Sequence, residues 1–164
     1  MIWMVCVSDI LACPALCRCN MDYYMYCDNA AVTDSNLKTV LNSIPQTATY
    51  IDFSYNKIQY LQRNSFTRFK QLKNLNFASN EILKIDDGTF DSLHDILVLD
   101  LRNNRLENIN GRVFSVQSKL KELYLQSNNI RSVNVDAFRN LTQLKELHLQ
   151  NNKIMSLPLT LFHD

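Results

Sequence analysis

The chain has 164 residues, of which 46% are apolar and 20% are charged, so one domain with a buried core is expected. Its formal net charge of +1 argues against a nucleic-acid surface or a basic membrane-binding face, because both need clustered Lys and Arg. Only two glycines and three prolines are present. We therefore expect asparagine, which tolerates left-handed backbone, to make many of the turns.

Residues 1–12, MIWMVCVSDILA, lie where a secretory leader would. Removing them would also remove Cys6 and leave an even four cysteines. Against a leader, no positive charge follows Met1 and Asp9 interrupts the apolar run. An intact leader and a clipped or mis-started one both stay open. No stretch of the sequence approaches the ~20 apolar residues that are needed to span a bilayer.

Four cysteines follow the leader segment, beginning with the motif CPALCRC. They are Cys13, Cys17, Cys19 and Cys27. Spacing alone allows three disulfide connectivities, and a zinc site with four cysteine ligands is the competing interpretation. We favour disulfides, because the repeats that follow have a free end that needs a cover. The segment DSNLKTVLNSIPQTAT joins this cap to the repeats.

From residue 48 onward the sequence repeats with a period of 24 residues. The phrase LKELYLQSNNI at Leu120 returns as LKELHLQNNKI at Leu144. An asparagine column, a phenylalanine column and an aliphatic column recur in phase. They are Asn56, Asn80, Asn104, Asn128 and Asn152; Phe66, Phe90, Phe114, Phe138 and Phe162; and Leu61, Ile85, Ile109, Val133 and Leu157.

The spacing inside each unit, LxxLxLxxN, predicts one short strand per repeat. Two of its apolar residues are two positions apart and therefore point to the same face of a strand. A single unit cannot bury that face, whereas stacked units can, so the sequence predicts a solenoid. Buried asparagine amides must satisfy their donors and acceptor, and stacking lets them bond the main chain of their own and neighbouring coils.

These repeats resemble the leucine-rich-repeat family in its 24-residue extracellular form, as in Toll-like or relaxin-type receptor ectodomains, Slit-like proteins and small leucine-rich proteoglycans. The resemblance covers residues 48–164 and implies an α/β solenoid with short parallel β-strands on the concave face and an irregular or 3-10 outer coil. It divides the chain into a cap at 13–47 and repeats at 48–71, 72–95, 96–119, 120–143 and 144–164. The last repeat is incomplete, and we expect the chain to be a piece of a longer protein.

The cysteine cluster resembles the cysteine-rich N-terminal flank of the same family. For that flank the resemblance implies the pairs Cys13–Cys19 and Cys17–Cys27. One position departs from the repeat pattern, because Gln117 stands where the family expects an apolar residue. We predict a local shift that lets Val116 fill the gap.

Side chains that alternate with the buried leucines should face outward, and in this architecture they build the binding surface. Tyr124 becomes His148 in the next unit while the leucines around it stay fixed, so this column is expected to carry recognition. The candidate residues on the concave face are Tyr50, Asp52, Tyr55, Leu97, Val98, Asp100, Arg102, Glu122, Tyr124, Glu146 and His148. Among them Leu97 and Val98 form an apolar patch, and tyrosine is favoured at interface hot spots.

Glu122 and Glu146 should lie side by side on neighbouring strands, where like charges destabilise and a cationic partner would relieve the repulsion. We expect no catalytic centre. His94, His148 and His163 have no metal-ligand spacing. Two column-sharing aspartates could approach the roughly 6.5–9.5 Å separation of an inverting glycosidase pair, but a shallow sheet offers no pocket to raise one pKa. They are Asp52 and Asp100.

The sequence thus predicts an extracellular protein-binding scaffold or a fragment of a receptor ectodomain, with a structural matrix protein of the small proteoglycan type as the alternative. The partner is expected to be a protein, with no nucleic acid, small-molecule substrate, cofactor or metal. We expect a secreted protein or one on the outer side of the plasma membrane, attached there only if the full chain continues into a span. Asn140, in Asn140-Leu141-Thr142, is the expected glycosylation site.

Overall fold

The structure is a computed structural model that describes residues 13–20, 23–158 and 160–161. The expected leader at 1–12, with Cys6, lies outside the described residues, as do Phe162 and His163.

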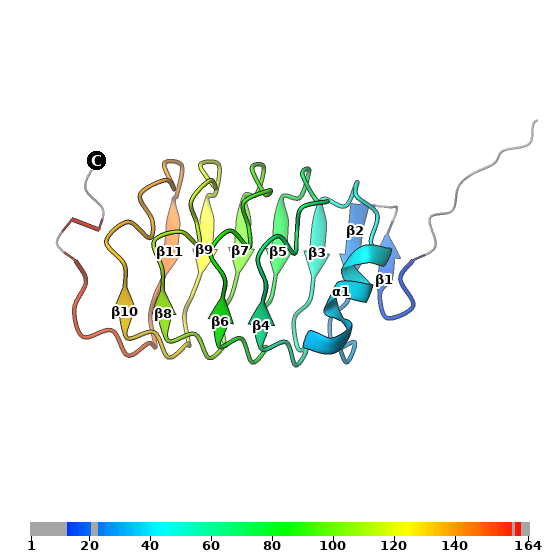
Figure 1. Cartoon of the computed structure of the whole chain (residues 1–164), viewed down its shortest axis with the longest axis horizontal. Coiled ribbons are helices and arrows are strands. Elements are labelled where there is room, and N and C mark those ends of the chain that lie inside the picture. Colours follow the sequence, from blue (N-terminus) through cyan, green and yellow to red (C-terminus); the bar gives the residue numbers. More distant parts are fainter. Residues whose placement is uncertain (1–12, 21–22, 159, 162–164) are drawn as a thin grey trace, which may run out of the picture.

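The chain winds into a solenoid whose coils each add one three-residue strand to a seven-stranded sheet (Figure 1). The strands of this sheet are β1 (Arg18–Asn20), β2 (Tyr24–Tyr26), β3 (Tyr50–Asp52), β5 (Asn74–Asn76), β7 (Val98–Asp100), β9 (Glu122–Tyr124) and β11 (Glu146–His148). β1 is antiparallel to β2, and each later pair is parallel. The predicted solenoid with short parallel strands is confirmed.

The side of the coil away from this sheet consists mainly of turns (Figure 1). It also carries two small parallel sheets, which the sequence did not predict. β4 (Tyr60–Leu61) pairs with β6 (Lys84–Ile85), and β8 (Asn108–Ile109) pairs with β10 (Ser132–Val133). The second residue of each of these strands is buried and belongs to the aliphatic column, so the stacking of that column brings the backbones into pairing distance.

A helix, α1 (Asp34–Ser43), lies in the segment that the sequence identified only as a connection (Figure 1). Its buried residues follow helical spacing and join the core. They are Leu37, Val40 and Leu41. The helix begins after Thr33, whose backbone N–H donates to Asn36 Oδ1 at 2.8 Å. It ends at Ser43, shortly before Pro45, and the residue that precedes a proline disfavours helical backbone.

Two disulfides join Cys13 to Cys19 and Cys17 to Cys27 within the cap. Cys27 is fully buried and directly follows β2, the strand that pairs with the first repeat strand, β3. The second bridge therefore ties the N-terminal end of the solenoid core to the exposed chain before it. Such a cross-link mainly restricts the unfolded chain.

The asparagine column is buried and bonds successive coils together, as predicted. Asn104 is representative. Its Nδ2 donates to Phe77 O at 2.9 Å on the preceding coil and to Leu101 O at 3.1 Å on its own coil. Its Oδ1 accepts from the backbone N–H of Ile82 at 2.9 Å. The same ladder reaches the cap, because Asn56 Oδ1 accepts from the N–H of Val32 at 2.8 Å.

The phenylalanine column stacks on the outer side of the core, with ring centroids 6.2 Å apart from Phe90 to Phe114 and again from Phe114 to Phe138. The prediction that Val116 would replace Gln117 in the core is wrong. Gln117 itself is fully buried and Val116 only partly so. The Gln117 Nε2 donates to Phe90 O at 2.7 Å on the preceding coil, which offsets the cost of burying the amide.

Candidate binding surface on the sheet

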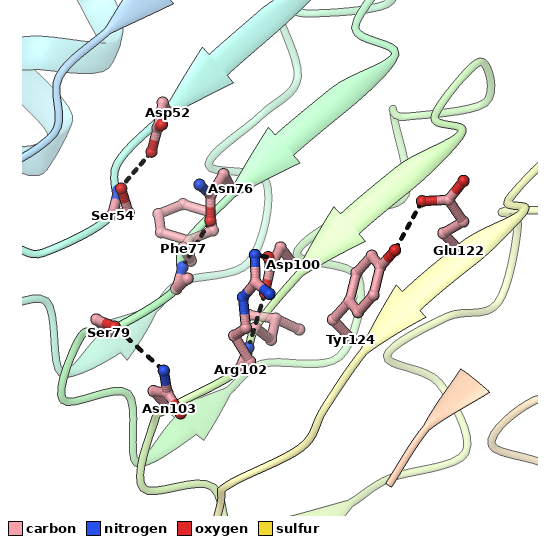
Figure 2. Close-up of polar contacts among 12 residues, drawn as sticks. Asp52, Ser54, Asn76, Phe77, Ser79, Asp100, Arg102, Asn103, Glu122 and Tyr124 are labelled. Carbon is pink, nitrogen blue, oxygen red and sulfur yellow. Dashed lines mark hydrogen bonds and ion pairs between the residues drawn. The ribbon is translucent and has the colours of Figure 1, made fainter. Parts of the chain in front are cut away.

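The sheet face consists of the first and third residues of the strands from β2 to β11 together with the residue two positions beyond each strand. Between them, the middle strand residues are core residues, such as Leu75, Leu99 and Leu123. Figure 2 shows part of this face from β3 to β9. Most predicted contact residues lie on it and are partly or fully exposed. They are Tyr50, Asp52, Val98, Arg102, Glu122, Tyr124, Glu146 and His148.

Asp100 is an exception to the prediction that this column is exposed, because only 6% of it is accessible. Its Oδ1 accepts from the Arg102 N–H at 3.0 Å, and its Oδ2 forms an ion pair with the Arg102 guanidinium at 2.8 Å. Burial raises the pKa of Asp100 above its ordinary value, although the contacts with Arg102 oppose the rise. The expectation that no carboxyl of this column would have a raised pKa is therefore also wrong.

The first three repeats use this column to hold the turn after the strand. Side-chain Oδ1 atoms accept from the backbone N–H two residues later, at 2.8 Å for Asp52, 2.8 Å for Asn76 and 3.0 Å for Asp100 (Figure 2). Only a short side chain with an acceptor can close this Asx turn. The column is thus free to vary in the last two repeats, at Tyr124 and His148, but has a structural role before them.

Those last two repeats form an aromatic ladder with a cation at one end. The Tyr124 and His148 rings stack at 4.7 Å between centroids, and the Arg102 guanidinium carbon lies 5.5 Å from the Tyr124 centroid. Tyr124 donates its hydroxyl proton to Glu122 Oε2 at 2.9 Å, a bond that raises the pKa of Tyr124 (Figure 2). His148 Nε2 lies 3.3 Å from Glu146 Oε2. The two glutamates, which are register neighbours, each have a partner on their own strand.

A second aromatic group lies where the cap meets the first repeat. The Tyr50 ring centroid is 5.8 Å from that of Tyr24 and 5.4 Å from that of Tyr26, and Tyr50 donates to Asp52 Oδ2 at 3.2 Å. Burial, and then the charge and hydrogen bond of Asp52, raise the pKa of Tyr50 to about 12. Sequence reasoning missed the two cap tyrosines because it kept the cap out of the sheet. The alternation in YMY, which matches YID of β3, is the signal that could have found them.

The remaining predicted contact residues sit differently from expectation. Tyr55 is in the turn after β3, with left-handed backbone at φ 56° and 67% of its surface exposed. Leu97 precedes β7 and is, like Val98, partly buried, so together they expose less apolar surface than the sequence suggested.

Metal sites and membrane spans are both lacking from the described part of the chain. No group of three or more His, Cys, Asp or Glu side chains there could hold a metal ion. No helix among those residues is long and apolar enough to cross a membrane.

Comparison with known proteins links this geometry to relatives. A family model described as the BspA type leucine rich repeat region matches residues 42–164 in six copies. The chain is similar to TLR13 in its complex with ssRNA13, with a TM-score of 0.78 and 33% identity over 85% of this chain and 20% of that chain. It is also similar to a structure of the Drosophila Toll–Spatzle complex, with a TM-score of 0.66 and 27% identity over 69% of this chain and 15% of that chain. The chain thus spans a fifth or less of these neighbours, and no curated protein matches it.

Proposed function

Because the chain belongs to the leucine-rich-repeat family, we propose that it is a segment of an extracellular receptor ectodomain or scaffold that binds a protein through its sheet face. The disulfides of the cap support an extracellular location, since such bonds persist in oxidising compartments. The neighbours support a ligand-binding role, because both were solved as complexes with a ligand.

The observation that carries the proposal is the ladder of Arg102, Tyr124 and His148 across three neighbouring coils. Tyrosine and arginine dominate the energetics of protein interfaces, and here they are held in fixed positions by Glu122 and Asp100. A surface that is ordered before binding loses less side-chain entropy on binding.

RNA is the competing ligand, because the TLR13 neighbour was solved with an RNA. The charges of the sheet face favour a protein instead. Its carboxylates outnumber its guanidinium groups, and carboxylates repel the phosphates that dominate nucleic-acid affinity. The charged residues among the predicted contacts are Asp52, Asp100, Glu122, Glu146 and Arg102.

The experiment is capture of partners from extracellular fluid by the secreted protein, followed by affinity measurement with three sheet-face variants. They are Leu97→Asp, Glu122→Lys and Tyr124→Ala. A hot spot among them should cost at least ~2 kcal/mol of binding, while each variant changes stability by about 0.5 kcal/mol. Leu123→Ala is the contrast, because its side chain is buried and should cost ~2–5 kcal/mol of stability.

The matched control for binding is Val135→Asp, an exposed position in the turn after β10. Capture that is unchanged in all three sheet-face variants but weakened by Val135→Asp would refute the proposal. A single-stranded RNA probe that binds the parent protein and loses affinity in the sheet-face variants would replace the protein ligand with RNA.

A further inference from the structure

The described part of the chain holds three of its own cationic side chains in one manner, each between a tyrosine ring and an aspartate. The sets are Arg18–Tyr26–Asp28, Arg102–Tyr124–Asp100 and Lys84–Tyr60–Asp86. In that order, the cations lie 6.0, 5.5 and 5.4 Å from the ring centroid and 2.6, 2.8 and 3.2 Å from the carboxylate. A tyrosine face and a carboxylate side by side thus form a recurrent receptor for a cation in this protein.

Tyr50 and Asp52 form a fourth pair of this kind on β3. Tyr50 donates its hydroxyl proton to Asp52 at 3.2 Å, as Tyr60 does to Asp86. Unlike the other three aspartates, Asp52 has no ion pair with any Lys or Arg among the residues that the structure describes. Its carboxylate is held in place by the Ser54 N–H at 2.8 Å, so it is fixed as well as charged.

The surroundings of this pair suit an incoming positive charge. On one side lie the tyrosines of β2, and Tyr24, the nearer to solvent of the two, is 44% exposed. On the other side the register neighbours of Tyr50 and Asp52 are Asn74 and Asn76, which carry no charge. Tyr26 is already covered by the chain's own Arg18, which leaves Tyr24 and Tyr50 as the available rings.

We propose that Tyr24, Tyr50 and Asp52 bind an arginine or lysine side chain of the partner protein, with the rings against the cation and the carboxylate as its ion-pair partner. Arginine fits best, because its planar guanidinium stacks on rings and donates in a fixed geometry to a carboxylate. The inference rests on the proposed function, whose partner it describes chemically as a protein that presents a basic side chain to the cap end of the sheet face.

The test uses a short peptide, acetyl-Gly-Arg-Gly-amide, titrated into the full chain with ¹³C-labelled tyrosine rings observed by NMR. The probe for comparison is the same peptide with citrulline, which has the shape of arginine but no charge. Ring signals of Tyr24 and Tyr50 should shift with the arginine peptide and should move little with the citrulline peptide. Asp52→Asn should weaken the arginine response about three- to fivefold, the effect of one partly exposed ion pair with its ring contact.

Asp52→Asn should keep the fold, because Asn76 makes the same turn bond at 2.8 Å with an amide in the same column. The matched control is Asp100→Asn, which removes the same charge from the same column on β7. It should change the response of Tyr24 and Tyr50 by less than about twofold, because the two strands are separated by β5 and exposed charges are screened. Equal effects of the two variants, or equal responses to the two peptides, would overturn the inference.

This test is separable from that of the proposed function. If the sheet-face variants at Glu122 and Tyr124 weaken partner capture but the arginine peptide leaves Tyr24 and Tyr50 unmoved, the inference falls and the proposed function stands. If the peptide binds as described but those variants capture the partner normally, the cation site stands and the role of the wider sheet face falls.

Discussion

Replacing Asn104 by alanine should break the amide ladder at the centre of the solenoid. The Asn104 side chain is buried, and its Oδ1 is the acceptor for the Ile82 N–H on the preceding coil. Its Nδ2 donates to Phe77 O and Leu101 O, which keep other amide partners from Asn80 and Asn128. The main consequence is therefore one buried N–H without an acceptor, with two further hydrogen bonds lost.

The magnitude follows from these three contacts. An unsatisfied buried donor costs about 1–3 kcal/mol, and each additional hydrogen bond contributes about 0.5–1.5 kcal/mol. Asn104→Ala should therefore lower the free energy of unfolding by about 2–6 kcal/mol. The neighbouring Asn103 is the control, because it is exposed and has φ 54°, which glycine adopts without strain. Asn103→Gly should change stability by no more than about 0.5 kcal/mol.

The assay is urea unfolding at 25 °C, followed by circular dichroism, with amide hydrogen exchange of Ile82 as the local measurement. Exchange at Ile82 should accelerate in Asn104→Ala and remain slow in Asn103→Gly. If Asn104→Ala unfolds at the same urea concentration as Asn103→Gly, the amide ladder does not hold the coils together and the reasoning is refuted.

Three further predictions concern the turns, the cap and the outer coil. Tyr55→Asn should raise the free energy of unfolding by about 0.5–1 kcal/mol, since asparagine tolerates left-handed backbone better and the tyrosine ring is mostly exposed; thermal melting measures this, and a lower Tm would contradict it. Loss of the Cys17–Cys27 bridge in a double alanine variant should cost ~2–4 kcal/mol, and unchanged urea unfolding would show that the bridge is dispensable. Protein made in a secretory pathway should carry a glycan at Asn140, an exposed position, and Asn140→Gln should leave partner binding intact. Gel mobility that does not change after glycosidase treatment would exclude that glycan.

The repeat and its core could be predicted from the sequence because both depend on spacing alone. A 24-residue period with an apolar pair two positions apart leaves few arrangements that bury every coil. The asparagine ladder was predictable for the same reason, since a buried amide that recurs in phase needs main-chain partners on neighbouring coils.

The candidate surface was less predictable, because it depends on where side chains turn after the strand. Asp100 is two-faced in sequence: it alternates outward, yet it bends back to bond the Arg102 N–H and is buried under that residue's guanidinium. The place of Tyr24 beside Tyr50 depends on β2 joining the sheet, which spacing did not reveal because the interval from β2 to β3 is 26 residues rather than the 24 of the repeats. Helix α1 had a detectable apolar spacing, but its short pattern was outweighed by the stronger signal of the repeats.

Photo-crosslinking from the sheet face tests the central claim most directly, because it captures a partner of any identity. Benzoylphenylalanine would replace Glu122 on β9 in one sample and Val135, in the turn after β10, in another. After irradiation in extracellular fluid, we predict a discrete protein adduct from position 122, none from position 135, and loss of the adduct when Tyr124→Ala is added. An adduct from position 135 alone would contradict recognition through the sheet face.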